Sequence, residues 1–447
     1  MTVSPIPTGV LHPVATAVAI ADRLIDPVPI ITATGPAATS LSRGLAGTAL
    51  LHARLSRHDR RYAAAADAHW SRATHMNIET PPRTGGVFNG IGALAASLIL
   101  GTPYLADPGR HQTSVDRSVR WLAARAAAVA AWQRDRRTAG DAGTPWQTFD
   151  VINGLAGIGR VLLAAAQEGH ADAEEGLHAA QESLIAMIET PDGSRPGWWR
   201  PAPQHPAALA DPHNVDAANT GLAHGIAGPL AFLAACQLTG HGSVRQAEAI
   251  RVASDWLLDW RDGDGWPPQI TADDLAGTAT APSTRGRRDA WCYGAPGIGV
   301  ALHAAGHALA DPDLIGLGLA AIDALATRSG RWDTEGATIC HGTAGVLLCA
   351  AAAGSISTTN AALAELTAQH DPRLPFLFSH SDHGTVTDEP GLLVGAAGIA
   401  LLFADMAEPE TPATWTAALL MPAATRRGER GPFHSLSSAT TEGRFPR

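Results

Sequence analysis

The sequence is poor in charged residues, aromatic residues and cysteine. Charged residues make up 17% of the 447 residues, and aromatic residues make up 5%. So few aromatic side chains argue against an all-β barrel or sandwich. The formal net charge is −10 and the arginines are scattered along the chain, so we expect no nucleic acid as a partner.

Cysteines and long apolar runs are also scarce. Four cysteines do not make a disulfide framework in a chain of this length. The first residues lack a basic segment followed by an apolar run, so we expect no signal peptide. The longest apolar stretches, such as 225–236, are too short and too often interrupted by Gly and Pro to span a bilayer. We therefore expect a cytoplasmic protein without a transmembrane segment, whose free thiols suit metal binding or catalysis.

What is present is a repeated glycine signature. Six segments read Gly-x-x-Gly followed by apolar residues, and a seventh is one residue short; their first glycines are Gly44, Gly90, Gly154, Gly225, Gly294, Gly342 and Gly395. An apolar run of helical character follows these segments. Amphipathic stretches lie between them at 114–132, 173–188, 244–260 and 314–326.

This pattern predicts an all-α fold. Glycine permits the turn into a helix, and small residues at the helix start let backbones approach closely. We expect an α/α toroid (a closed barrel) of about seven helix pairs, with the Gly-x-x-Gly segments at the inner helix starts. An open helical solenoid is the alternative, and the unequal spacing of the segments disfavours it. The toroid domain is expected at 1–422, followed by a polar, disordered tail at 423–447.

Three residues that can bind a metal precede two of the glycines. Cys292 stands in Trp-Cys-Tyr-Gly (291–294), and Cys340 and His341 stand in Cys-His-Gly (340–342). Two thiolates and an imidazole suit Zn²⁺, and three protein ligands leave a fourth position open, as in catalytic sites. Neighbours in a regular helix do not face the same way, so Cys340 and His341 can share an ion only from a loop or a helix end. The other two cysteines are interpreted as inert core residues.

Four further residues are candidates for chemistry. His224 occupies the repeat position of the metal-binding histidine, and it is either a packed histidine or an acid–base group near the metal. Asp150 stands among apolar residues shortly before a glycine segment, and it is either an N-cap or part of the central site. Arg288 and Tyr293 flank Cys292. Arg288 is either a surface residue or a group that stabilises a developing enolate. Long loops at 191–219 and 263–288 precede two reactive segments and are expected to form walls or a rim.

Three motifs resemble those of a known family. They are Gly-Leu-Ala-His-Gly (221–225), Trp-Cys-Tyr-Gly-Ala-Pro-Gly (291–297) and Cys-His-Gly-Thr-Ala-Gly (340–345). Their order, and the seven glycine segments between about 41 and 407, resemble the lanthionine synthetase C-like family, the lanthipeptide cyclases. The resemblance implies an α/α toroid and one Zn²⁺ ion, and it implies the following residues of the site: the ligands Cys292, Cys340 and His341, the acid–base groups His224 and Asp150, and the additional site residues Arg288 and Tyr293.

The resemblance also implies an activity. Such a cyclase adds a peptide Cys thiol to dehydroalanine or dehydrobutyrine and so forms the thioether of (methyl)lanthionine, a step of antibiotic biosynthesis. The chemistry needs a thiolate at neutral pH, where a free cysteine is mostly protonated. The implied partners are a dehydrated precursor peptide (leader plus core), a separate dehydratase and a transporter. Which of the two acid–base groups donates the proton stays open.

Two alternative functions use the same kind of site. One is a family relative that binds thiols or glutathione, or adds glutathione, without making lanthionine. The other is a prenyltransferase-like zinc thiol transferase, which also has an α/α toroid. Prenyltransferases resemble the chain less, because their Asp/Cys/His ligand set fits the Cys-His-Gly motif poorly.

Overall fold

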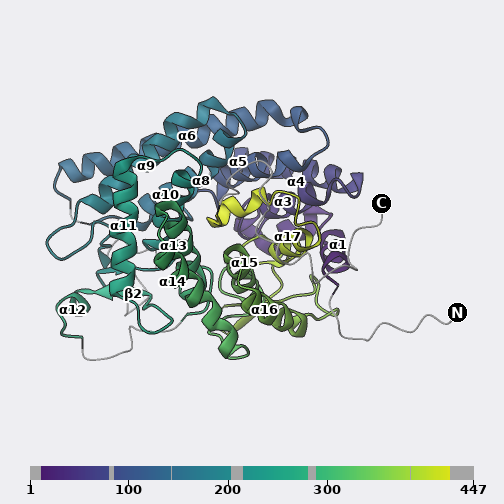
Figure 1. Ribbon diagram of the computed structural model, residues 1–447. Helices are drawn as coiled ribbons and strands as arrows, with labels where there is room; N and C mark the ends of the chain where they lie inside the picture. Colours follow the sequence, from purple (N-terminus) through teal and green to yellow (C-terminus); the bar gives the residue numbers. More distant parts are fainter. Residues whose placement is uncertain are drawn as a thin grey trace.

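The computed structural model describes residues 12–79, 85–141, 143–202, 215–279, 288–382 and 384–422 (Figure 1). Most of these residues are helical, and the four short strands among them form two antiparallel pairs. No helix in the described ranges is both long enough and apolar enough to cross a membrane. The tail expected at 423–447 lies outside the described residues.

An inner ring of helices begins at the glycine segments. Among the described residues these helices are α3 (Leu45–Leu55), α5 (Gly90–Gly101), α8 (Leu155–Gln167), α10 (Ala227–Leu238), α13 (Ala295–Leu309), α15 (Thr343–Ala353) and α17 (Ala396–Ala407). Their residues are buried along nearly the whole length of each helix. Each inner helix packs against the next in chain order, and α17 packs against α3, so the ring is closed (Figure 1).

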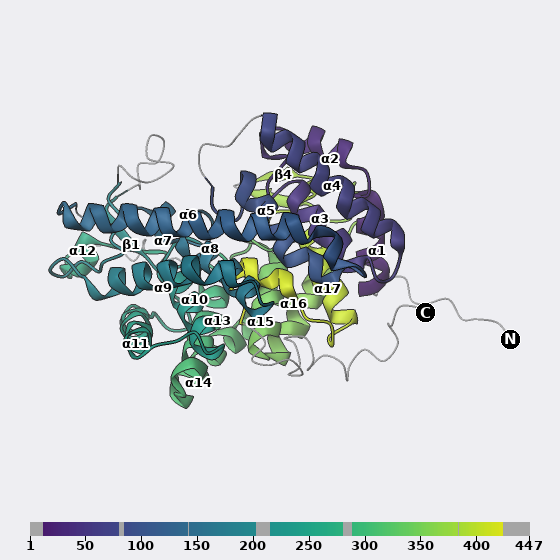
Figure 2. The same cartoon turned by 90° about the horizontal axis from the view of Figure 1, so that it is seen from above.

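An outer layer of amphipathic helices covers this ring. It contains α4 (Arg60–Glu79), α6 (Gln112–Thr138), α9 (Glu174–Glu189), α11 (Val244–Asp259), α14 (Pro312–Asp323) and α16 (Ile356–Gln369), each packed on the inner helix before it. The N-terminal helix α1 (Pro13–Arg23), followed by α2 (Pro27–Thr34), packs on α17 and covers the last inner helix. In Figure 2, α6 is the long helix that crosses α5, α8 and α9. The predicted α/α toroid is therefore confirmed, and the open solenoid is not.

Backbone hydrogen bonds link the loops that precede the inner helices. We call this chain of bonds the loop belt; its N–H···O bonds run from Val151 to Ala223 (3.1 Å), Ala223 to Cys292 (3.1 Å), Cys292 to Cys340 (3.1 Å), Cys340 to Leu393 (2.9 Å), Leu393 to Ser42 (2.9 Å) and Leu41 to Phe88 (3.0 Å). Since these loops all stand at inner helix starts, the belt gathers the reactive residues of several repeats at one end of the toroid.

A C-terminal segment, the 3₁₀ helix η8 (Thr414–Leu419), packs against α5 and α8 and lies at the centre of Figure 1. The hydroxyl of Thr414 donates to the carbonyl of Leu100, at the end of α5, over 2.6 Å. The indole N–H of Trp291 donates to the Leu419 carbonyl over 3.0 Å. The loop that carries the first cysteine motif thus rests on this segment.

The long loops meet through short strands. β1 (Ala217–Asn219) pairs with β2 (Gln269–Thr271), so the two loops expected to form walls lie side by side over their described parts. The short helices α7 (Trp146–Phe149) and α12 (Ala272–Leu275) flank them. A second pair, β3 (His380–Asp382) with β4 (Thr385–Thr387), lies between α16 and α17 in the chain.

Candidate metal centre and acid–base pair

Cys292, Cys340 and His341 come together at the loop belt. Cys292 lies just before α13, and Cys340 and His341 lie just before α15. The N–H of Cys292 donates to the carbonyl of Cys340 over 3.1 Å, which places the two loops side by side. The two sulfur atoms and a ring nitrogen of His341 all lie within 4.8 Å of one another. One ion can therefore contact all three side chains.

Hydrogen bonding makes one of the two thiols acidic. A hydrogen bond from Cys340 lowers the pKa of Cys292 to about 5; burial opposes this shift, and the charges of His341 and Arg288 support it. The same hydrogen bond, together with burial, raises the pKa of Cys340. Burial lowers the pKa of His341, but the neighbouring Cys292 thiolate outweighs it, so the net pKa is raised. These shifts favour the thiolate of Cys292, which is the form of cysteine that binds a metal.

The donor atoms fit zinc. Nε2 of His341 is buried and has no hydrogen-bond partner in the described part of the chain. A buried polar atom without a partner is costly, and an ion bound at this nitrogen would remove the cost. Two thiols and one imidazole are donors that Zn²⁺ prefers, and three protein ligands are typical of a zinc ion that also binds a substrate.

Two carboxylates that the sequence did not indicate lie next to His341. An oxygen of Glu335 and one of Asp382 are within 4.8 Å of a ring nitrogen of His341 and of each other. Arg288 reaches the same group, because its Nη2 is 3.5 Å from Glu335 Oε1 and its Nε is 3.8 Å from Asp333 Oδ2. Arg288 thus lies beside the candidate metal ligands, between the carboxylates of Asp333 and Glu335.

Asp150 and His224 form a second cluster on the belt. Asp150 is 1% exposed, and its Oδ2 is 2.7 Å from Nδ1 of His224. The other oxygen, Oδ1, accepts hydrogen bonds from the N–H groups of Asn153 (2.7 Å) and Gly154 (2.8 Å). Asp150 therefore stabilises the turn before α8, whose N-cap is Gly154, and its other oxygen faces the histidine.

Aromatic side chains enclose the histidine. The ring of Trp146 stacks on His224 with a centroid distance of 4.6 Å and an interplanar angle of 14°. The ring of Tyr293, in the loop that carries Cys292, has its centroid 6.5 Å from that of the His224 ring. The guanidinium of Arg200 lies over Trp146 at 5.2 Å from the ring centroid. Tyr293, which follows Cys292, thus bridges the metal cluster and the Asp150 cluster.

Two glycines make this close approach possible. A Cβ atom at position 221 would lie 2.5 Å from Tyr293 Cδ1 and 2.6 Å from the Cys292 carbonyl oxygen. Gly294 has φ +102°, which favours glycine, and a Cβ there would lie 1.7 Å from the Arg288 carbonyl oxygen. Glycine is required at these two positions, because a Cβ atom would collide with residues of the site.

Comparison with known proteins identifies the family. The family model described as "Lanthionine synthetase C-like protein" matches residues 35–420, which is most of the chain. The chain belongs to the lanthionine synthetase C-like family. The family resemblance of the three motifs is therefore confirmed.

Two relatives support this membership of the lanthionine synthetase C-like family. The nisin biosynthesis protein NisC of Lactococcus lactis subsp. lactis is 24% identical over 210 residues, which cover 44% of this chain and 47% of that protein. The match thus spans about half the length of this curated relative. A solved structure of nisin cyclase has a TM-score of 0.71 to this chain at 19% identity, covering 90% of this chain and 96% of the other. At this identity the likeness shows the shared toroid fold.

The sequence indicated seven candidate site residues. All seven lie at the loop belt, either in one of the two clusters or between them. The sequence did not indicate Trp146, Glu335 or Asp382, since none of them stands next to a repeated glycine. His380 does not stand next to a repeated glycine either, and its ring centroid is 5.0 Å from that of His341. The remaining cysteines, Cys236 and Cys349, are buried, and burial raises the pKa of both thiols.

Proposed function

We propose that this lanthionine synthetase C-like protein is a zinc-dependent lanthipeptide cyclase. It would add a peptide Cys thiol to dehydroalanine or dehydrobutyrine in a Michael-type addition, which forms the carbon–sulfur bond of (methyl)lanthionine. The observation that carries the proposal is the position of a three-ligand thiol–imidazole cluster beside a buried Asp150–His224 pair on one belt. The reaction needs a thiolate nucleophile and a proton donor close together, and the two clusters supply them.

Cys292, Cys340 and His341 would hold the zinc ion. When bound, the ion supplies a Lewis acid that lowers the pKa of a substrate thiol. With two thiolate ligands and a neutral imidazole, the charge of the centre is about zero, so an added thiolate is not strongly neutralised. Glu335 and Asp382 lie next to His341 and would orient its ring.

The hydrogen bonds of Asp150 support a role for His224 in proton transfer. An ionised carboxylate only accepts, so Nδ1–H of His224 donates to Asp150 Oδ2. Both oxygens of Asp150 are then in use, and Nε2 is the nitrogen of His224 that can exchange a proton with the substrate. We propose that His224 takes the thiol proton and returns one to the α-carbon of the enolate, while Asp150 holds the ring.

Tyr293 and Arg288 would each stabilise a negative charge, Tyr293 that of the enolate and Arg288 that of the thiolates. Burial, and after it the charge of Cys292, raise the pKa of Tyr293, so its hydroxyl stays protonated and can donate a hydrogen bond. We assign the enolate oxygen to Tyr293 because its ring lies between the two clusters. Arg288, paired with Asp333 and Glu335, would favour thiolates at the metal centre, since its charge lowers the pKa of Cys292.

The partners follow from this reaction. The substrate is a dehydrated precursor peptide with leader and core, so a separate dehydratase must act first, and a transporter would export the product. The reaction would take place in the cytoplasm as a step of antibiotic biosynthesis. The toroid domain would extend over 1–422, with 423–447 as a tail.

The decisive assay incubates the zinc-loaded protein with a dehydrated Cys-containing peptide. Ring closure leaves the peptide mass unchanged, so the measurement is the loss of thiols that an alkylating reagent can modify. Cys292→Ala and Cys340→Ala should lose bound zinc and cyclisation, whereas Cys236→Ala, a change in the core away from the cluster, should keep both. Full zinc content in Cys292→Ala and Cys340→Ala would contradict the ligand assignment. A mass gain of one glutathione on the dehydrated peptide, without ring closure, would favour the glutathione-adding alternative.

A further inference from the structure

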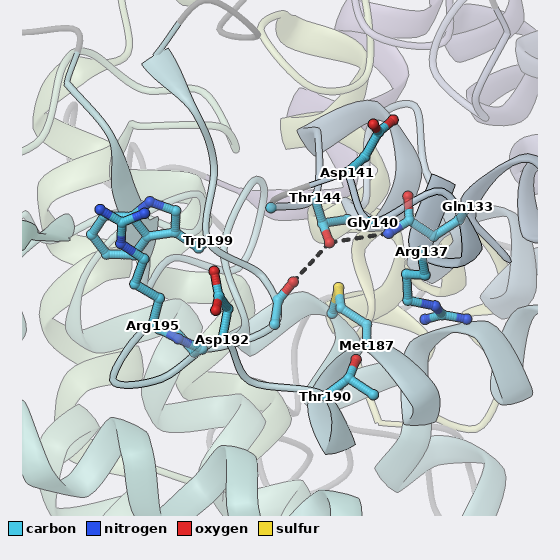
Figure 3. A pocket seen from close by; sticks show the side chains of 13 residues that line it. Gln133, Arg137, Gly140, Asp141, Thr144, Met187, Thr190, Asp192, Arg195 and Trp199 are labelled. Carbon is cyan, nitrogen blue, oxygen red and sulfur yellow. Dashed lines mark hydrogen bonds between the residues drawn. The ribbon is translucent and has the colours of Figure 1, made fainter. Parts of the chain in front are cut away.

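A separate cavity of about 360 Å³ lies on the flank of the toroid (Figure 3). It is bounded by the C-terminal end of α6, the end of α9 and the loop that leads towards β1. Its lining includes Gln133, Arg137, Met187, Arg195 and Trp199. None of the proposed zinc ligands or acid–base residues lines it. The volume is large enough for an amino-acid side chain and its backbone.

Three buried polar atoms of this lining have no hydrogen-bond partner in the described part of the chain. They are Oε1 of Gln133, Nη1 of Arg137 and Nε1 of Trp199. Gln133 and Trp199 are 2% and 3% exposed, so bulk water does not satisfy them. Leaving a buried polar group unpaired is unfavourable. Two donors and one acceptor are the complement of a peptide segment that offers a carboxylate, a backbone carbonyl and an amide N–H.

The charges around the cavity favour an anion. Arg137 and Arg195 line it together with Asp141 and Asp192, but Asp141 is already paired with Arg136 at 3.1 Å. With Asp141 paired to Arg136, which does not line the cavity, the two lining arginines face one remaining lining carboxylate, Asp192. Burial, and after it the charge of a neighbouring arginine, lower the pKa of Arg137, as expected for a guanidinium without a carboxylate partner. In Figure 3, Arg195 and Trp199 lie at one end of the pocket, and Gln133 and Arg137 lie at the other.

The cavity shares a wall with the acid–base pair. The N–H of Thr144 donates to the carbonyl of Trp199, and its hydroxyl donates to the carbonyl of Gly197, both over 2.7 Å. The chain then runs from Thr144 to Trp146, whose ring stacks on His224. A ligand in the cavity therefore lies behind the same strip of chain that encloses the catalytic histidine.

We propose that this cavity binds an acidic side chain of the peptide substrate, with its carboxylate held by Arg137 at one end of the pocket, while the indole N–H of Trp199 at the other end donates to a backbone carbonyl of the same peptide. Oε1 of Gln133 accepts a backbone N–H of the same peptide. The cavity thus anchors a substrate segment at a point outside the metal centre. The identity of the ligand as substrate rests on the proposed function, whereas the binding of an acidic side chain does not.

The test uses blocked tripeptides as probes. Acetyl-Ala-Glu-Ala-amide and its Gln counterpart are titrated at millimolar concentrations into full-length protein with ¹⁵N-labelled tryptophan. The measurement is the indole N–H signal of Trp199, assigned with Trp199→Phe. The Glu peptide should shift this signal, and the Gln peptide should bind at least about tenfold more weakly. Arg137→Gln should lose the preference for Glu, whereas Arg134→Gln, an exposed arginine on the same helix, should keep it.

Several outcomes would overturn the proposal. They are equal binding of the two peptides, no shift of the Trp199 signal with the Glu peptide, or wild-type binding by Arg137→Gln. The other indole signals report whether each variant is folded, so a misfolded Arg137→Gln would be replaced by Arg137→Lys, which keeps the charge and should retain the Glu preference with lower affinity.

The binding assay needs neither zinc nor cyclisation, so it separates the two proposals. A protein that binds the Glu peptide but closes no ring contradicts the cyclase function and not the pocket. In the cyclisation assay, Arg137→Gln should raise KM for a peptide with an acidic residue and leave kcat unchanged, and a lowered kcat at unchanged KM would argue against an anchoring role.

Discussion

Replacing Asp150 by asparagine tests the proposed proton transfer. The amide has the same shape as the carboxylate, and its oxygen can still accept the N–H groups of Asn153 and Gly154. Its NH₂ group must then face Nδ1 of His224, where it donates instead of accepting. His224 is forced into the tautomer that carries the proton on Nε2. The nitrogen that should take the thiol proton can no longer accept it.

The expected effect on rate is large, and the effect on stability is moderate. A positioned general acid–base group contributes about 10²–10⁴-fold, so kcat of Asp150→Asn should fall by at least about 10²-fold. The variant also loses the charge on a group that accepts two backbone N–H bonds. A bond to a charged group exceeds a neutral one by roughly 1 kcal/mol, so the free energy of unfolding should fall by about 2 kcal/mol. Bound zinc should be unchanged, because Asp150 belongs to the other cluster.

The assay measures kcat from the loss of alkylatable thiols, together with zinc content and urea unfolding. Asp405→Asn is the matched control, because Asp405 is also 1% exposed and binds Arg54 and Trp415, each over 2.7 Å, near the C-terminal end of α17, whereas the Asp150–His224 pair lies at the loop belt. It should lose stability and keep kcat. If Asp150→Asn retains a kcat close to that of the wild type, the assignment of His224 and Asp150 is refuted. If it loses zinc, the separation into two clusters is wrong.

Two further predictions concern the scaffold. Gly294→Ala should lower both Tm and zinc affinity, because φ is +102° and the new Cβ would meet the carbonyl of Arg288; Gly316→Ala on α14, which has no neighbour within 4 Å, should raise stability by up to about 1 kcal/mol. His52 and His69 are buried in a T-shaped pair, and burial lowers their pKa values to about 3 and about 4. The unfolded chain therefore binds more protons below pH 6.5, so urea unfolding should show stability falling as the pH drops from 6.5 to about 4, by about 1.4 kcal/mol per pH unit for each histidine. The variant with both histidines replaced by glutamine should lose most of this slope, and an unchanged slope would contradict the assignment.

The inner ring could be predicted from the sequence because its physical requirement is visible there. A Cβ at Gly157 would lie 1.9 Å from the carbonyl oxygen of Val151, and one at Gly398 would lie 2.0 Å from that of Leu392. Only glycine fits, so the repeat marks the helix starts directly. The closure of the outer layer was not predictable in this way. The helices α1 and α17, which pack together, are separated by nearly the whole sequence, and no repeated residue marks their contact.

The residues of the candidate site also fall into those that the sequence could predict and those that it could not. The proposed zinc ligands stand next to repeated glycines, so their convergence followed from the repeat. Trp146 and Glu335 stand on connections of irregular length, and only the folded chain places them against His224 and His341. For Asp150 the sequence left an N-cap and a site residue as alternatives. The N-cap of α8 is Gly154, so Asp150 is not the N-cap; its Oδ1 accepts from the turn before that helix and its Oδ2 faces His224, so its role in the site stays a prediction.

The loop belt explains why a site can be built from repeats of such unequal length. The first glycines are separated by intervals of 46 to 71 residues, so the outer connections differ greatly. The distance between the metal cluster and the acid–base pair does not depend on those connections, because the N–H of Ala223 bonds to the carbonyl of Cys292 and the N–H of Val151 bonds to that of Ala223. Cys292 and Cys340 make such bonds themselves, and Asp150, His224 and His341 are one position from one. Changes of length on the outer surface are therefore absorbed far from the proposed zinc ligands, whereas a single methyl group at Gly294 would displace the loop that carries one of them.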